Sequence, residues 1–325
     1  MEASMFAINK NRVMLFTISE RGVETYFIKK TDMKKKYLFP FFFVALFLGC
    51  RSETKEGKML SVTIEPQRYF LENIVGDSYK INTIVPVGVS PETYEPTPAM
   101  MMKLGKSAIF FKVGFLGFEN AWAERLKKNN PDVKIVNCSE GIELIYGEHH
   151  HATGKSEGED EHTLLPDPHV WSSPKTARIF AENMYRALIT SDPQNEEFYR
   201  EKFSELIEQI DRTDSIITQL LRDIPSRSFI IYHPALSYLA RDYGLKQYSI
   251  EFEGKNPSPA QMKALIDIAR KEGINVVFVQ QGFDTKNAIV VANEIGAKVY
   301  RINPLAYEWD KELIRIAHIL AGKQE

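Results

Sequence analysis

The strongest constraint on the fold is a double series of short apolar runs that alternate with helical patterns. Four runs in the first half of the chain are rich in β-branched and aromatic residues, and the segments between them have the periodicity of amphipathic helices. Nearly continuous apolar strands that alternate with helices predict a parallel sheet covered on both faces. We expect strands at 60–66, 80–86, 107–113 and 133–138, and helices at 67–76, 98–105 and 117–129.

A second series of the same rhythm follows in the last third of the chain. The two series predict an α/β fold of two similar lobes, each with a mostly parallel four-stranded sheet flanked by helices. The length of 325 residues agrees with about two domains. The second set of strands is expected at 228–233, 247–251, 275–280 and 298–302, with helices at 235–243, 259–272, 285–296 and 309–321.

A stretch without strands between the two series predicts one long helix. Apolar residues recur at helical spacing from Phe198 to Leu221, after a start signal at Asp192-Pro193. A helix of about 29 residues would be roughly 44 Å long and would form a rigid bridge. We therefore assign 59–173 to an N-terminal lobe, 174–225 to a helical linker and 226–325 to a C-terminal lobe.

The region before the first lobe indicates export. Residues 33–49 contain three lysines, then an apolar run from Tyr37 to Leu48, and they end with a small residue before Cys50. The apolar run is too short to cross a bilayer, which needs about 20 residues, and is typical of a signal peptide. Because signal peptides start at the initiating methionine, we interpret residues 1–32 as a non-native upstream extension. The alternative is a cytoplasmic extension on an anchor helix.

The sequence around Cys50 resembles a bacterial lipobox. In "LFLGC" the signal would be cut before the cysteine, which would then receive lipid, although Phe47 stands where leucine is usual. Residues 50–58 would form a lipidated tether. Cys138 is the only other cysteine, so a lipidated chain has no intramolecular disulfide available despite an oxidising compartment.

The balance of charges argues against a nucleic-acid partner. The chain has 41 Lys and Arg residues against 43 Asp and Glu residues, which gives a formal net charge of -2. Its aromatic residues are not interleaved with basic runs, as a stacking groove for bases would require. We therefore expect no nucleic-acid binding.

Polar groups lie just beyond several of the predicted strands. Glu92 comes after the second strand, His169 after the last strand of the first lobe, and His233 at the end of a strand in the second lobe. In open α/β sheets, ligands bind beyond the carboxyl ends of the strands. Two imidazoles and a carboxylate suit Zn²⁺, with Mn²⁺ or Fe²⁺ as alternatives, because these metals take nitrogen and oxygen ligands. One such histidine is more often structural, so the prediction depends on all three.

Several segments together resemble one known family over 59–323. They are "VGVSPETYEPTP", "DPHVWSSP", "YHPALSYLARDYGL", "EGKNPSPAQMKALI", "VVFVQQGFDTKNA" and "INPL". The chain is similar to the zinc/manganese solute-binding lipoproteins of metal-importing ABC transporters, the ZnuA/TroA-like family. The resemblance implies two α/β lobes bridged by one long helix, with the metal between the lobes.

The resemblance also implies a set of metal ligands. The family's histidine in the "DPH" segment falls on His169, and its ligand in the "HPA" segment falls on His233, where histidine favours zinc over manganese. The family's first ligand is usually histidine but here is Glu92, and its fourth is often aspartate but here is Asn303. Asn303 offers only a neutral amide oxygen or an outer hydrogen bond. We therefore expect the affinity or metal preference to differ from the family norm.

Neighbouring residues are expected to support this site. Tyr94 and Tyr238 flank it in the sequence and could hydrogen-bond the ligands, which is a common orienting role. Trp171 and Trp309 are expected to pack between the lobes. Gln280 and Gln281 stand where some relatives have acidic residues, and their role is open.

A histidine-rich acidic segment at 148–162 contains four of the chain's seven histidines and five acidic residues. Its low apolar content predicts a mobile loop. Loops of this kind in zinc-importing family members resemble a low-affinity metal collector, and the alternative is a variable loop whose histidines have no role. The accessory metal-binding residues would be His149, His150, His151 and His162.

Together these features predict a binding protein and not an enzyme. It would capture Zn²⁺, with Mn²⁺ as the second candidate, and deliver it to an ABC permease and its ATPase. It would be a monomer, anchored through Cys50 on the periplasmic side of a bacterial membrane. The main alternative is a metal-dependent hydrolase or oxygenase, because both classes use two-His one-Glu ligand sets. An adhesin is a third hypothesis, without independent support in the sequence.

Overall fold

The computed structural model describes residues 59–146, 165–251 and 255–323, and the backbone of 3–9, 12–19 and 22–29. The chain separates into two compact units, Met1–Glu56 and Gly57–Glu325. The first unit contains a three-stranded antiparallel sheet for which the sequence predicted no strands, and the signal peptide and tether predicted at 33–58, with Cys50, lie outside the described residues. The strands of this sheet are β1 (Ala3–Asn9), β2 (Arg12–Ser19) and β3 (Gly22–Lys29).

The N-terminal lobe is built on a four-stranded parallel sheet with the strand order β5-β4-β6-β7. In its inner strand β4, Leu60, Ser61 and Val62 are all buried, because helices cover both faces of the sheet. The elements of the lobe are β4 (Met59–Val62), α2 (Glu65–Val75), β5 (Lys80–Thr83), α3 (Pro98–Leu104), β6 (Ser107–Lys112), α4 (Gly117–Asn129) and β7 (Lys134–Asn137).

The C-terminal lobe repeats this arrangement with the strand order β9-β8-β10-β11. In both lobes the first strand lies between the second and the third, so the chain reverses its direction across the sheet beside that strand. Such a reversal opens a crevice at the carboxyl ends of the strands. The elements are β8 (Ser228–Ile231), α7 (Ser237–Tyr243), β9 (Lys246–Ser249), α8 (Pro259–Glu272), β10 (Val276–Gln280), α9 (Lys286–Ile295), β11 (Lys298–Ile302) and α10 (Trp309–Leu320).

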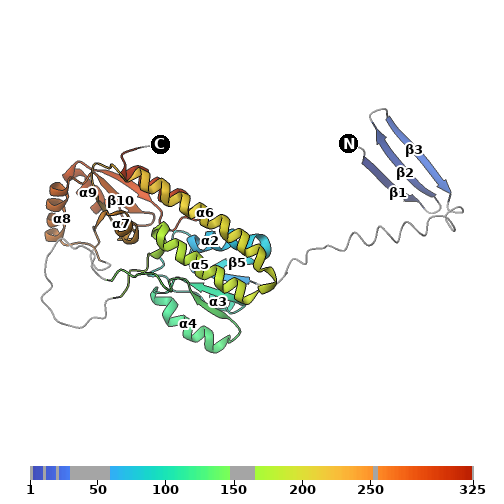
Figure 1. Cartoon of the computed structure of the whole chain (residues 1–325), viewed down its shortest axis with the longest axis horizontal. Helices are drawn as coiled ribbons and strands as arrows, with labels where there is room; N and C mark the ends of the chain where they lie inside the picture. The colour runs from blue at the N-terminus through green and yellow to red at the C-terminus, as the bar shows by residue number, and fades with distance from the viewer. Residues whose placement is uncertain are drawn as a thin grey trace. The chain divides into compact units, whose positions relative to one another are not determined.

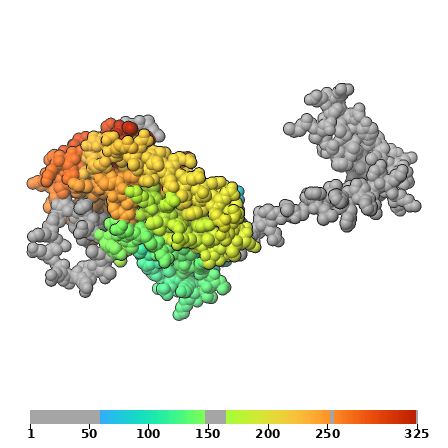
Figure 2. Space-filling model, viewed as in Figure 1, coloured from blue at the N-terminus to red at the C-terminus, as the bar shows by residue number. Residues whose placement is uncertain are grey.

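Two linker helices join the lobes, α5 (Pro174–Ser191) and α6 (Glu196–Leu220). Helix α6 packs against α2 and α5 and also against α10 of the C-terminal lobe, so it bridges the lobes as predicted. Figure 1 shows its length along the molecule. In Figure 2 the linker helices form a continuous yellow surface that borders both the orange and the green parts of the molecule. The helix has 25 residues, or about 38 Å, instead of the expected 29, because Pro193–Asn195 forms a separate 3₁₀ turn.

Most of the predicted helix boundaries agree with the structure to within two residues. Helix α2 begins at Glu65, two residues earlier than predicted, because Pro66 suits the first helical turn and the Gln67 side chain accepts hydrogen bonds from the amides of Thr63 and Ile64. Within the described part of the chain, no helix combines the length and the apolar character that a membrane crossing needs.

Candidate metal site

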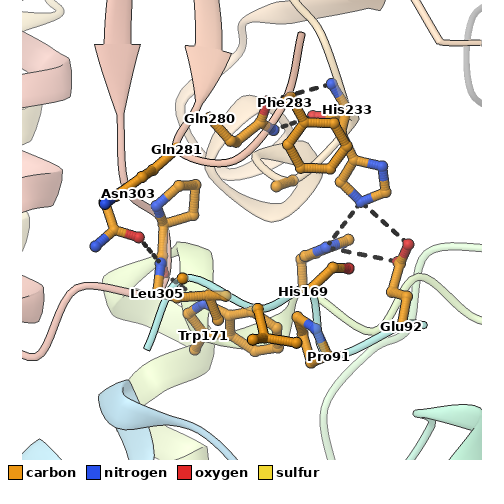
Figure 3. A pocket seen from close by; sticks show the side chains of 15 residues that line it. Pro91, Glu92, His169, Trp171, His233, Gln280, Gln281, Phe283, Asn303 and Leu305 are labelled. Atoms are coloured by element: carbon orange, nitrogen blue, oxygen red, sulfur yellow. Dashed lines mark hydrogen bonds and ion pairs between the residues drawn. The ribbon is translucent and has the colours of Figure 1, made fainter. Parts of the chain in front are cut away.

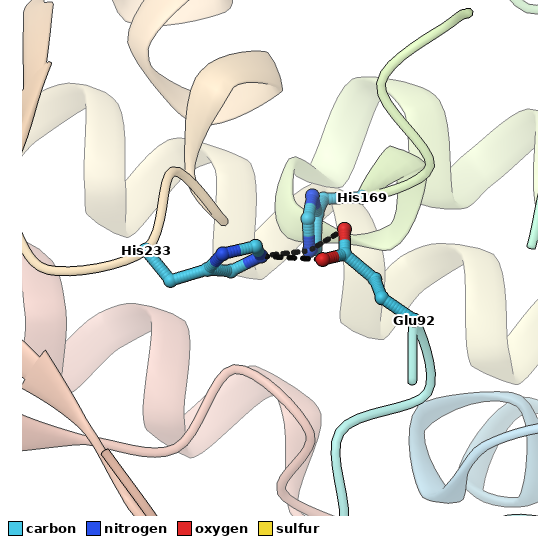
Figure 4. Close-up of side chains that lie close together, drawn as sticks. All are labelled: Glu92, His169 and His233. Carbon is cyan, nitrogen blue, oxygen red and sulfur yellow. Dashed lines mark hydrogen bonds and ion pairs between the residues drawn. The ribbon is translucent and has the colours of Figure 1, made fainter. Parts of the chain in front are cut away.

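Three side chains converge at the carboxyl ends of the two sheets. Glu92 lies in the segment between β5 and α3, His169 precedes the short 3₁₀ helix η2 (Val170–Ser172), and His233 follows β8. Each residue offers one ligand atom, and these atoms all lie within 4.8 Å of one another. Figure 4 shows both imidazole rings and the carboxylate pointing toward a common centre.

The distances between the three side chains match a small metal ion. His233 Nε2 lies 3.3 Å from His169 Nε2 and 3.3 Å from Glu92 Oε2, and His169 Nε2 lies 3.7 Å from Glu92 Oε1. Two ligand atoms that are each about 2.1 Å from a tetrahedral zinc ion are about 3.4 Å apart. The two imidazole nitrogens and the Glu92 carboxylate could therefore bind one ion with little movement.

A second carboxylate orients each imidazole ring. Asp167 Oδ1 lies 2.8 Å from His169 Nδ1, and Glu251 Oε2 lies 3.1 Å from His233 Nδ1. When each Nδ1–H donates to its carboxylate, the lone pair of Nε2 faces the other ligands. This carboxylate–histidine pairing is the usual support of histidine ligands in metal sites.

The ionisation of the site follows from these contacts. Burial would lower the pKa of His233, but hydrogen bonds to Glu251 and Glu92 outweigh it and raise the pKa to about 9. Burial would raise the pKa of Glu92, but its hydrogen bond to His233 and the charges of the two histidines lower it. At neutral pH a proton therefore occupies His233 and must leave when a metal binds.

Asp167 and Glu251 were not predicted from the sequence to support the histidine ligands. Asp167 is buried, and although burial would raise its pKa, the charge and hydrogen bonds of His169 lower it, so it stays ionised. Its position two residues before His169 was a signal that could have been used. Glu251 follows β9, and it meets His233 because β9 pairs with β8 in the sheet.

The amide of Gln280 holds the backbone of His233 from the end of β10. His233 N donates to Gln280 Oε1 at 3.3 Å, and Gln280 Nε2 donates to the His233 carbonyl oxygen. Gln280, whose role the sequence left open, therefore fixes the backbone of the candidate ligand His233 through two hydrogen bonds. Phe283 stacks on the His233 ring, with ring centroids 5.5 Å apart and an interplanar angle of 14°.

Asn303 lines the same cavity but does not extend toward the three ligands. Its Oδ1 accepts a hydrogen bond from Leu305 N at 3.2 Å, and its backbone amide donates to Glu312 at 2.7 Å. Figure 3 places Asn303 on the opposite side of the cavity from Glu92. The cavity itself is narrow, with a volume of about 50 Å³, so the space beside the three ligands suits an ion and a small additional ligand.

Among the residues that the structure describes, Tyr94 makes no hydrogen bond to the ligands, whereas Trp171 and Trp309 lie between the lobes as expected. Tyr94 packs edge-on against Phe118, with ring centroids 5.8 Å apart. Trp171 Nε1 donates to the Pro304 carbonyl at 2.8 Å, and Trp309 Nε1 donates to the Trp171 carbonyl at 2.7 Å. These two bonds join the segment of His169 to the C-terminal lobe.

The predicted accessory histidines, His149, His150, His151 and His162, lie outside the described residues. The described segments before and after these histidines pair with each other, because Tyr146 and Pro166 form an antiparallel bridge. The described residues Tyr146 and Pro166 therefore lie side by side, and Pro166 lies on the chain that leads to His169.

Comparison with known families identifies a match over most of the chain. The family model for ZnuA, the periplasmic component A of a zinc-uptake complex, matches residues 61–313. The high-affinity zinc uptake system protein ZnuA of Bacillus subtilis (strain 168) is 29% identical over 290 residues, which cover 84% of this chain and 90% of that protein. The manganese ABC transporter substrate-binding lipoprotein PsaA of Streptococcus pneumoniae is 27% identical over 266 residues, which cover 78% of this chain and 81% of that protein.

A similar fold is found among solved structures. The crystal structure of a ZnuA variant that lacks residues 138–173 of its own sequence, with zinc bound, is 34% identical to this chain. The two superpose with a TM-score of 0.72, over 82% of this chain and 97% of that one.

Proposed function

This chain belongs to the ZnuA family, and from that premise we propose that it captures Zn²⁺ outside the cytoplasm and delivers it to the permease and ATPase of an ABC importer. One observation carries the proposal. Two imidazole Nε2 atoms and one carboxylate converge between the lobes at distances of 3.3 to 3.7 Å, and each ring is oriented from behind by a carboxylate.

The ligand atoms favour zinc over manganese. Zinc binds well to sites with two imidazoles and one carboxylate, whereas Mn²⁺ prefers mainly oxygen ligands and binds more weakly to the same donors. Glu92 is the only carboxylate among the three converging side chains. The manganese relative therefore supports Mn²⁺ only as the second candidate.

The charge of a bound dication is compensated without Asn303. Glu92 contributes one negative charge directly, and Asp167 and Glu251 contribute two more through the imidazole rings they contact. A histidine that donates to a carboxylate is a stronger ligand for the metal. The neutral amide at position 303 therefore does not leave the ion without a counter-charge.

Membership of a family of uptake components favours binding over the enzymatic alternative. Of the described residues that line the cavity, the only titratable ones are Glu92, His169 and His233, which are the candidate ligands themselves. A hydrolase needs a general base or acid in reach of the substrate in addition to the metal.

The placement of the protein in the cell is part of the proposal. We infer a signal peptide at 33–49 behind a non-native extension at 1–32, lipidation of Cys50, and a tether at 50–58 that holds a monomer on the periplasmic side of a bacterial membrane. The lipoprotein name of the related PsaA supports this. The histidines of 148–162 would serve as a weaker accessory collector of metal.

A competition titration of the purified protein with Zn²⁺ and Mn²⁺ tests the function. We expect one tight site that prefers zinc and that is lost in His169→Ala and in His233→Ala. His318→Ala is the matched control, because His318 lies on α10 outside the cavity lining. The absence of a tight site, or turnover of a substrate by the metal-loaded protein, would refute the proposal.

A further inference from the structure

We propose that Tyr238 is a positioning residue for the metal ligand His169, an inference that rests on the function proposed above. Tyr238 lies on α7 in the C-terminal lobe and is fully buried. It does not line the cavity, and it acts on His169 through Asp167.

The Tyr238 hydroxyl joins two segments of chain that run side by side. It donates to the Asp167 carbonyl oxygen at 2.8 Å and accepts a hydrogen bond from Ile145 N at 3.4 Å. Asp167 N in turn donates to the Ile145 carbonyl at 2.8 Å. The three groups form a closed set of hydrogen bonds beside the Tyr146–Pro166 bridge.

Asp167 links the position of its own backbone to the orientation of the His169 imidazole ring. Its Oδ1 accepts one hydrogen bond from the His169 backbone amide and contacts His169 Nδ1, both at 2.8 Å. Since one carboxylate oxygen holds both the backbone and the ring, the place of the Asp167 backbone sets the direction of His169 Nε2. Tyr238 holds that backbone through the carbonyl oxygen.

His233 lies just before the helix that carries Tyr238. Helix α7 begins at Ser237, a few residues after His233, so the helix that holds Tyr238 is tied to the second ligand. One rigid unit therefore positions His233 directly and His169 through Tyr238 and Asp167. This accounts for the 3.3 Å between the two Nε2 atoms, although the histidines are 64 residues apart.

The hydroxyl can be removed without removing the ring. The guanidinium of Arg241 lies 5.0 Å from the centre of the Tyr238 ring and donates to the Glu143 carbonyl at 2.7 Å. The Tyr238→Phe substitution keeps the ring and its contact with Arg241. It leaves the buried Asp167 carbonyl without this hydrogen bond, so the backbone of Asp167 is held less firmly and His169 with it.

The test compares the full chain with its Tyr238→Phe variant. We expect the Kd for Zn²⁺ to rise about tenfold, the lower end of the loss seen when outer support of a ligand is removed. The visible spectrum of the Co²⁺-loaded variant should change in band position or intensity, because it reports the ligand geometry. Tyr199→Phe is the control, since it also removes a buried tyrosine hydroxyl that donates a hydrogen bond, in this case to the Asp192 carboxylate at 2.7 Å, but on α6 away from the cavity. It should change neither the Kd nor the spectrum.

A double-mutant cycle shows whether Tyr238 acts through Asp167. In an Asp167→Ala background, Tyr238→Phe should change the Kd less than twofold, because the side-chain oxygen that links the backbone of residue 167 to His169 is then absent. A Kd within twofold of wild type for Tyr238→Phe with an unchanged Co²⁺ spectrum, or full additivity in the cycle, would overturn the positioning role alone. A wild-type protein without a tight zinc site would instead overturn the proposed function.

Discussion

Proton competition at His233 should make zinc affinity depend strongly on pH. The pKa of His233 in the metal-free protein is raised to about 9 by Glu251 and Glu92, against the effect of burial. Zinc requires the neutral imidazole, so the apparent affinity falls about tenfold for each pH unit below this pKa. Between pH 8 and pH 6 the Kd should therefore rise about 90-fold, whereas a histidine with an ordinary pKa of about 6.5 would give only about fourfold.

The proton that leaves can be counted directly. At pH 7.5, zinc binding should release about one proton from His233, compared with about 0.1 for a histidine of ordinary pKa. Calorimetry in buffers of different ionisation enthalpy measures this number, and competition with a chelator at pH 8, 7 and 6 gives the affinities. The low pKa of Glu92 keeps that carboxylate ionised throughout this range, so it does not add to the release.

A matched variant tests whether the charge of Glu251 raises the pKa of His233. Glu251→Gln removes the charge beside His233 Nδ1 but keeps a side chain of the same shape. The pKa of His233 should fall, and the proton release at pH 7.5 should fall with it. A fourfold change in wild-type Kd between pH 8 and pH 6, with no proton released at pH 7.5, would refute the reasoning.

Two further predictions concern the metal-free protein and Asn303. Because the pKa of His233 is raised from 6.5 to about 9, its stabilising contribution is fully present below pH 6.5 and is lost as the pH rises through 9. The free energy of unfolding should fall by up to about 3 kcal/mol, which denaturant titrations at several pH values would measure; a flat profile would contradict it. Asn303→Ala should change the zinc Kd less than threefold in the same competition assay, because its Oδ1 is bonded to Leu305 N. A tenfold loss would make Asn303 a ligand.

Local patterns account for the elements that were predicted most accurately. Helix α8 begins and ends as expected, because Ser258 caps it together with Gln261, Pro259 occupies its first turn, and Gly273 ends it with a positive φ of 65°. Such signals lie within a few residues of the boundary they set. The α/β alternation, the two lobes and the bridging helix followed from patterns of the same local kind.

The candidate ligands were also accessible from the sequence, because they follow apolar strands and the carboxyl ends of parallel strands meet at one edge of a sheet. Glu92, His169 and His233 could be named on that basis together with the family resemblance, before any distance between them was known. Their chemical type was enough to suggest zinc.

The supporting contacts depend on which strands and helices become neighbours. Glu251 meets His233 only because β9 pairs with β8, and Tyr238 reaches Asp167 only because α7 packs on the chain before η2. Asn303 is turned away from the ligands by a hydrogen bond inside its own loop. Apolar periodicity and strand-end positions are properties of short segments, so they can be recognised in the sequence. The raised pKa of His233 and the orientation of His169 arise from groups that are distant in the chain or fixed by packing. These two properties are therefore specified only when the two lobes fold together.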